Sequence, residues 1–210
     1  MTEISVRFGL LKLAPALLTA LRAILAPIVV LLAIYAPKPG AFAACLVAAF
    51  VSDVFDGIIA RRLGVATPTL RRLDSAADTL FYAACVFAAW RLYPAAIRVR
   101  LLPLSILIAL ESLRYILDFA KFHREASYHM WSSKLWGIGL FVGFFSLLVF
   151  GSQGAAVSLA LYLGIIADLE GIAISVILPR WQSDVPSFVH AMRAKRLWQH
   201  GGAKFDRDAR

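Results

Sequence analysis

Four aspartates stand at regular spacings inside an otherwise apolar part of the chain. The first pair, Asp53 and Asp56, is three residues apart, and the second pair, Asp74 and Asp78, is four residues apart. On helices, each spacing places both carboxylates of a pair on one face. Carboxylate oxygens suit hard divalent cations, so the cluster could hold two Mg²⁺ or Mn²⁺ ions that bridge substrate phosphates. Residues 52–78 contain neither Cys nor His, which argues against zinc.

Small residues continue the helical stripe of the first aspartate pair. Gly57 and Ala60 follow Asp56 at positions that share its face. Such a stripe leaves room for a bulky ligand beside the carboxylates, although it could also serve as a small-residue surface for helix packing. The neighbouring carboxylates favour the ligand.

The composition places these residues in a membrane protein. The chain is 60% hydrophobic with a mean hydropathy of +0.75, which exceeds what the core of a soluble domain needs. The net charge of +9 comes from basic residues in connectors and in the tail, where they would meet lipid headgroups rather than nucleic acid. Cys45 and Cys85 lie in apolar runs and predict neither a disulfide nor a zinc site.

The apolar runs predict an all-α protein with six transmembrane helices in one membrane domain, residues 1–178. An amphipathic segment at 3–13 is expected to lie in the interface, and residues 179–210 to form a basic cytoplasmic or interfacial tail. Most Lys and Arg of the connectors fall on one side, so both termini and the aspartates should face the cytoplasm from an inner membrane. The predicted spans are 14–35, 41–61, 73–90, 101–120, a segment ending near 150, and 155–178.

The aspartate stretch resembles the signature of the CDP-alcohol phosphotransferases, D-x-x-D-G-x-x-A-R followed after a spacer by G-x-x-x-D-x-x-x-D. Leu70 stands where that family has its second glycine, which removes the space a glycine leaves. The segment 15–27 is similar to the family's P-N-x-x-T-x-x-R, with Ala16 in place of Asn, and 132–137 is loosely similar to its G-K segment. The matching residues are Asp53, Asp56, Gly57, Ala60, Arg61, Asp74 and Asp78.

The resemblance implies an enzyme of phospholipid synthesis. It would move a phosphatidyl group from CDP-diacylglycerol to a polar acceptor alcohol and release CMP, with divalent metal held by the four aspartates. Asp78 would also act as general base, and Gly57, Ala60 and Arg61 would border the nucleotide. The resemblance further implies a homodimer. Glycerol 3-phosphate is the first candidate acceptor, because arginines surround the site, and serine or an inositol phosphate stays open.

Several charged residues outside the signature are candidates for other roles. Arg71, Arg114 and Lys134 could bind a phosphate on the acceptor, although Arg114 could instead pair with Glu111 or Asp118 in its own span. Asp168 and Glu170 lie on different helix faces, so one of them could bond to a neighbouring span or to the acceptor pocket. His123 and His129 are expected in an interfacial connector.

Two other functions remain open at this stage. The first is a small transporter or cation-binding membrane protein, for which acidic groups near the membrane midplane would be typical. The second, suggested by Leu70, is a degenerate family member that binds the CDP-lipid without turnover.

Overall fold

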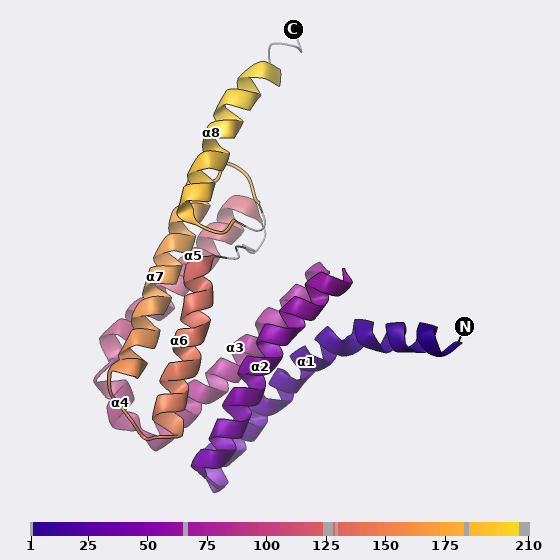
Figure 1. Cartoon of the computed structure of the whole chain (residues 1–210). Coiled ribbons are helices and arrows are strands. Elements are labelled where there is room, and N and C mark those ends of the chain that lie inside the picture. Colours follow the sequence, from indigo (N-terminus) through magenta and orange to yellow (C-terminus); the bar gives the residue numbers. More distant parts are fainter. Residues whose placement is uncertain (1, 65–66, 124–127, 129, 183–184, 206–210) are drawn as a thin grey trace. The chain divides into compact units, whose positions relative to one another are not determined.

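The computed structural model describes residues 2–64, 67–123, 128, 130–182 and 185–205, without the side chains of 2–12, 61, 68, 71 and 197–205. The described part of the chain is mostly α-helical and has no strand, which confirms the all-α part of the predicted fold class (Figure 1). The helices are α1 (Thr2–Tyr35), α2 (Pro39–Leu63), α3 (Pro68–Leu92), α4 (Pro94–Arg98), α5 (Leu101–Phe122), α6 (Trp131–Leu148), α7 (Ala155–Ile177) and α8 (Phe188–Phe205).

The helices group into two compact units. The first contains Met1–Arg98 and Phe144–Gln153, and the second contains Val99–Gly143 and Gly154–Arg210. The first unit therefore carries α1 to α4, and the second carries α5, most of α6, α7 and α8.

In the first unit, α1 packs along both α2 and α3. The buried residues between these helices are mostly small or aliphatic, such as Val29 and Ala33 of α1 and Cys85 and Ala88 of α3. Small side chains let helix backbones approach closely where lipid supplies no hydrophobic drive for association. Both cysteines are buried free thiols, as the sequence predicts.

The turn between α2 and α3 places the two aspartate pairs at neighbouring helix ends. Gly64, with a φ of 66°, follows α2 in the left-handed conformation that glycine adopts without strain. Thr67 caps α3: its hydroxyl accepts a hydrogen bond from the amide of Leu70 at 3.2 Å. Pro68 occupies the first helical position, where the missing N–H costs nothing. Local turn chemistry thus reverses the chain between Asp56 and Asp74.

In the second unit, α7 packs against both α5 and α8. Glycines allow α6 to approach α7 closely: a Cβ on Gly139 would lie 2.7 Å from Leu163 Cδ1, and one on Gly143 would lie 3.0 Å from Ala160 Cβ. Beside α8, a cluster of Met130, Ile174, Leu178, Val185 and Ala191 closes the end of α7. Residues 188–205 of the tail therefore form a helix that packs on its own unit.

Four of the described helices are long and apolar enough to cross a membrane: Leu13–Tyr35, Pro39–Ala60, Trp131–Leu148 and Ala155–Ile177. The other two predicted spans coincide with α3 and α5, which are helical but carry more charged residues. In α3 the first turns carry Asp74 and Asp78, and α5 carries Glu111, Arg114 and Asp118. Within the described part of the chain, length and composition therefore support four spans rather than six. The 3–13 segment is helical and forms the first part of α1, which runs without a break into the first span.

Candidate active site

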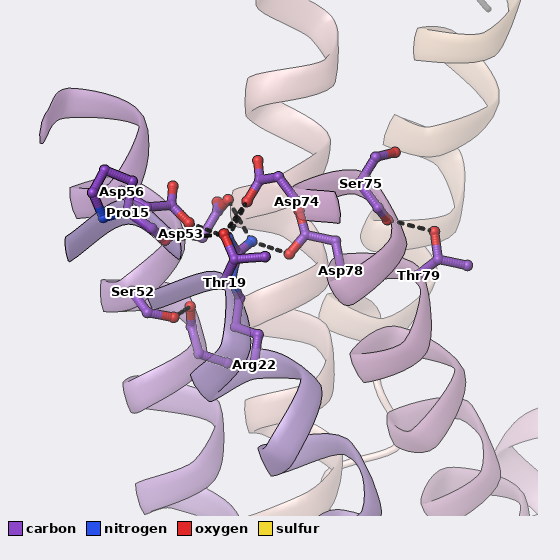
Figure 2. A network of polar contacts seen from close by, with 11 residues as sticks. Pro15, Thr19, Arg22, Ser52, Asp53, Asp56, Asp74, Ser75, Asp78 and Thr79 are labelled. Atoms are coloured by element: carbon purple, nitrogen blue, oxygen red, sulfur yellow. Dashed lines mark hydrogen bonds and ion pairs between the residues drawn. The ribbon is translucent and has the colours of Figure 1, made fainter. Parts of the chain in front are cut away.

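The four predicted carboxylates meet where α2 ends and α3 begins. Figure 2 shows Asp53 and Asp56 on one side and Asp74 and Asp78 on the other, with a side chain from α1 between them. One oxygen from each of Asp53, Asp56 and Asp74 lies within 4.8 Å of the others. Three such oxygens at this separation can share a cation. The structure thus brings both sequence-predicted pairs into one cluster.

The side chain between the pairs is Arg22, whose guanidinium contacts all four aspartates. Its Nη1 donates to Asp53 Oδ1 at 3.0 Å and to Asp78 Oδ1, and its Nη2 donates to Asp56 Oδ2 and Asp74 Oδ1. Each terminal nitrogen therefore joins one carboxylate of α2 to one of α3. Because α1 packs on both α2 and α3, an arginine at this position of α1 can reach the aspartates of both helices.

The cluster is buried at one edge and accessible at the other. The side chains of Arg22 and Asp56 are 1% and 5% exposed, whereas those of Asp53, Asp74 and Asp78 are 47%, 34% and 32% exposed. A charged ligand could therefore reach the three outer carboxylates while Asp56 and Arg22 stay enclosed. Charge-assisted hydrogen bonds of this kind are about twice as strong as neutral ones, so the cluster ties the three helices together.

Thr19 adds a hydroxyl one turn before Arg22 on the same face of α1. Its Oγ1 lies 3.1 Å from the carbonyl oxygen of Pro15 and 3.4 Å from Asp74 Oδ1, and its single proton can serve either acceptor. Arg22 and Thr19 are the site residues that the sequence analysis did not select. Two signals point to them: an arginine inside an apolar span, and the spacing of Pro15, Thr19 and Arg22 in the segment similar to P-N-x-x-T-x-x-R.

The residues predicted to border the nucleotide lie next to the cluster on α2. Ala60 is buried and Gly57 is half-buried, one helical turn beyond the aspartates. The side chains of Arg61 and Arg71 lie outside the described residues. Leu70 sits in the first turn of α3 with ordinary helical backbone, so the family's glycine is replaced without conformational strain, and the difference concerns space only.

Arg114 forms an ion pair inside the second unit. Its Nη1 lies 2.9 Å from Oδ1 of the fully buried Asp168, and its Nη2 lies 3.7 Å from Glu111 Oε1. The predicted alternative of a pair with Glu111 is thus present, but the nearer partner comes from α7. Asp118, the other predicted partner, accepts a hydrogen bond from Ser175 instead. The ion pair between Arg114 and the buried Asp168 therefore joins α5 to α7.

The second unit contains further polar links between its helices. Lys134 lies over the ring of Trp131 at 4.4 Å, a cation–π contact within the first turn of α6. Tyr128 bonds to Ser175 at 3.2 Å, and burial raises the pKa of its hydroxyl, which keeps it protonated at neutral pH. Lys121 donates to the carbonyl of Ser175 at 2.8 Å. The contacts of Lys121 and Tyr128 with Ser175 hold α5 and Tyr128 against α7.

Glu170 joins three segments of the same unit. Its carboxylate accepts from Ser132 Oγ at 2.5 Å and from the amide of Phe188 at 3.0 Å. Together with the Asp168 ion pair, this confirms the prediction that an acidic residue of α7 bonds to a neighbouring span. His123 ends α5 in the left-handed conformation and is exposed, whereas His129 lies outside the described residues.

The fold and the site define a helical membrane protein with a carboxylate cluster suited to divalent cations. The family model for CDP-alcohol phosphatidyltransferases matches residues 12–177, and because this is most of the chain, the protein belongs to that family. The comparisons with curated proteins and with solved structures found no significant match. Family membership supports phosphatidyl transfer from a CDP-alcohol in phospholipid synthesis, by an integral membrane protein of a family that generally uses divalent metal.

Proposed function

We propose that this protein transfers the phosphatidyl group of CDP-diacylglycerol to an acceptor alcohol, with glycerol 3-phosphate as the first candidate. The observation that carries the proposal is the convergence of two aspartate pairs from two helices. In the reaction, the acceptor oxygen forms a bond to the phosphatidyl phosphorus while the bond from that phosphorus to the bridging oxygen of the pyrophosphate breaks. The acceptor loses its proton, and CMP leaves with the bridging oxygen.

The donor set fits a divalent cation. All four side chains offer oxygen, three of them approach within 4.8 Å, and the cluster already accommodates one positive group, the guanidinium of Arg22. Asp53, Asp56, Asp74 and Asp78 would hold two Mg²⁺ or Mn²⁺ ions. When bound, such ions supply neutralisation of the charge that develops on the departing pyrophosphate oxygen.

Asp78 is the candidate general base. Its carboxylate is 32% exposed, so an acceptor hydroxyl can approach it, whereas Asp56 is enclosed. The hydrogen bond from Arg22 Nη1 would keep one Asp78 oxygen in place while the other receives the proton. A positioned carboxylate of this kind typically contributes about 10²–10⁴-fold to a rate.

The proposal also assigns residues to the two substrates. Gly57, Ala60 and Arg61 would border the cytidine head, whose acyl chains remain among the apolar spans. Arg71, Arg114 and Lys134 would bind the acceptor phosphate, and for Arg114 this means sharing a guanidinium that already contacts Asp168. The proposal also includes six spans in the inner membrane, with α3 and α5 among them. The active site and both termini would face the cytoplasm, and the protein would form a homodimer.

The test is CMP release by the purified protein supplied with CDP-diacylglycerol, Mg²⁺ and a panel of glycerol 3-phosphate, serine and inositol phosphate. We expect one acceptor to give CMP, and Asp78→Asn to remove at least about 10²-fold of the rate. Thr79→Val is the matched control, because the hydroxyl of this neighbouring residue donates within its own helix, to the carbonyl oxygen of Ser75 at 2.8 Å. CDP-lipid binding without product from any acceptor would identify a non-catalytic member and reject the proposal.

A further inference from the structure

One buried arginine neutralises part of a cluster of four carboxylates, and this arrangement suggests a role for it. Arg22 is 1% exposed and contacts every aspartate of the cluster. Against four negative charges it leaves a formal excess of three. We propose that Arg22 is a built-in counter-charge, a positioning residue that keeps the cluster assembled before divalent cations bind and that competes with them for the same oxygens; this rests on the proposed function.

The hydrogen-bond pattern supports competition. Arg22 contacts each aspartate through a single oxygen, Oδ1 of Asp53, Asp74 and Asp78 and Oδ2 of Asp56. A cation shared between α2 and α3 would draw on carboxylates of this cluster, each of which already gives one oxygen to Arg22. A guanidinium and a divalent cation both bind carboxylate oxygens. Cation binding therefore includes the free-energy cost of weakening the arginine contacts, and this cost lowers the affinity for the cation.

The third guanidinium nitrogen, Nε, indicates which contacts hold Arg22 in place. Its Nε is buried and, within the part of the chain that the structure describes, makes no hydrogen bond. The hydrogen bonds that the structure gives this side chain therefore all go to the four aspartates. Among the described residues, no other polar group holds the guanidinium in place, so it can shift when cations bind; the carboxylates in turn depend on its charge to remain close without repulsion.

Replacing Arg22 by a neutral residue should change stability and cation affinity in opposite directions. A neutral side chain at position 22 leaves four carboxylates facing each other, which destabilises the metal-free protein. It also deepens the negative potential and removes the competitor, which strengthens cation binding. A residue with a merely structural role would lower stability without raising affinity for the metal.

The experiment compares the full-length wild type with Arg22→Met and Arg22→Lys, using Mn²⁺ alone as the probe. Free Mn²⁺ is followed by electron paramagnetic resonance, and thermal unfolding is measured with EDTA and with Mn²⁺. For Arg22→Met we expect roughly tenfold tighter Mn²⁺ binding, a lower melting temperature in EDTA and a larger gain on adding Mn²⁺. Arg22→Lys, which keeps the charge on a single nitrogen, should lie between the two.

Arg100→Met is the matched control, because that guanidinium bonds to the neutral Ser158 Oγ at 2.9 Å and Gly154 carbonyl at 3.0 Å. Its Mn²⁺ affinity should equal that of the wild type. If Arg22→Met does not fold in EDTA, Arg22→Met with Asp53→Asn restores the formal excess of three charges and should fold. A double variant as unstable as the single one, or unchanged or weaker Mn²⁺ binding by Arg22→Met, would overturn the inference.

These measurements need neither donor nor acceptor, so they separate the two proposals. Absence of CMP release with tighter Mn²⁺ binding by Arg22→Met would reject the proposed enzyme and keep the counter-charge. Unchanged Mn²⁺ affinity of Arg22→Met together with normal CMP release by the wild type would reject the counter-charge and keep the proposed enzyme. Failure of the wild type to bind Mn²⁺ would reject both.

Discussion

Replacing Asp168 by Asn should lower the stability of the second unit substantially. Asp168 is fully buried and its Oδ1 lies 2.9 Å from Arg114 Nη1. Removing one partner of a buried ion pair typically costs about 3–5 kcal/mol, because the other charge stays behind unpaired. Arg114 is 25% exposed and has Glu111 at 3.7 Å, which limits the penalty. We therefore expect a loss near the lower bound, about 3 kcal/mol, or roughly 6–12 °C in melting temperature.

Thermal unfolding in detergent, followed by tryptophan fluorescence, measures this loss. Glu111→Gln is the control: its side chain is 53% exposed, and exposed pairs contribute at most about 1 kcal/mol. The combined change Arg114→Met with Asp168→Leu should regain most of the loss, since apolar replacement of a buried pair is often neutral. A melting temperature of Asp168→Asn equal to that of the wild type would contradict a stabilising role for the buried ion pair, as would a double variant no more stable than the single one.

Three further predictions concern helix packing, the α8 attachment and the metal. Gly171→Ala should lower the free energy of unfolding by about 1–3 kcal/mol, because a Cβ there would lie 2.8 Å from Arg114 Cδ. Gly137→Ala is the control: a Cβ there has nothing within 4 Å, so the change should be neutral or stabilising by up to about 1 kcal/mol. The melting temperatures of the two variants distinguish these outcomes. Glu170→Gln removes charge-assisted bonds from Ser132 Oγ and the amide at the start of α8, so hydrogen exchange there should accelerate about tenfold, and unchanged exchange would contradict this. EDTA should abolish CMP release and Mg²⁺ or Mn²⁺ should restore it; activity that survives chelation would reject the metal proposal.

The sequence was sufficient for the helices and for the pairing of the aspartates. Apolar runs placed the first span at 14–35, where the structure has Leu13–Tyr35, because a bilayer demands a fixed length of apolar helix. The spacing of Asp53 and Asp56, and of Asp74 and Asp78, fixed their shared faces by helical geometry alone. The short turn then left little freedom for the two pairs to lie apart.

The contacts between helices distant in sequence could not be predicted in the same way. Arg22 is 31 residues from Asp53, and no local spacing rule relates an arginine of one span to carboxylates of two others. Arg114 shows the same limit: its i,i+3 neighbour Glu111 was a predicted partner, whereas the nearer Asp168 is visible only once α5 packs on α7. Charged residues within α3 and α5 also lower the apolarity on which span prediction depends.

The most direct test of the central claim is CMP release from CDP-diacylglycerol by the purified protein with Mg²⁺ and glycerol 3-phosphate, serine or inositol phosphate. We expect release that requires one of these acceptors and is lost in Asp78→Asn but kept in Thr79→Val. No release with any acceptor, or equal release by Asp78→Asn and the wild type, would contradict the claim that the four-aspartate cluster is the active site of a phosphatidyltransferase.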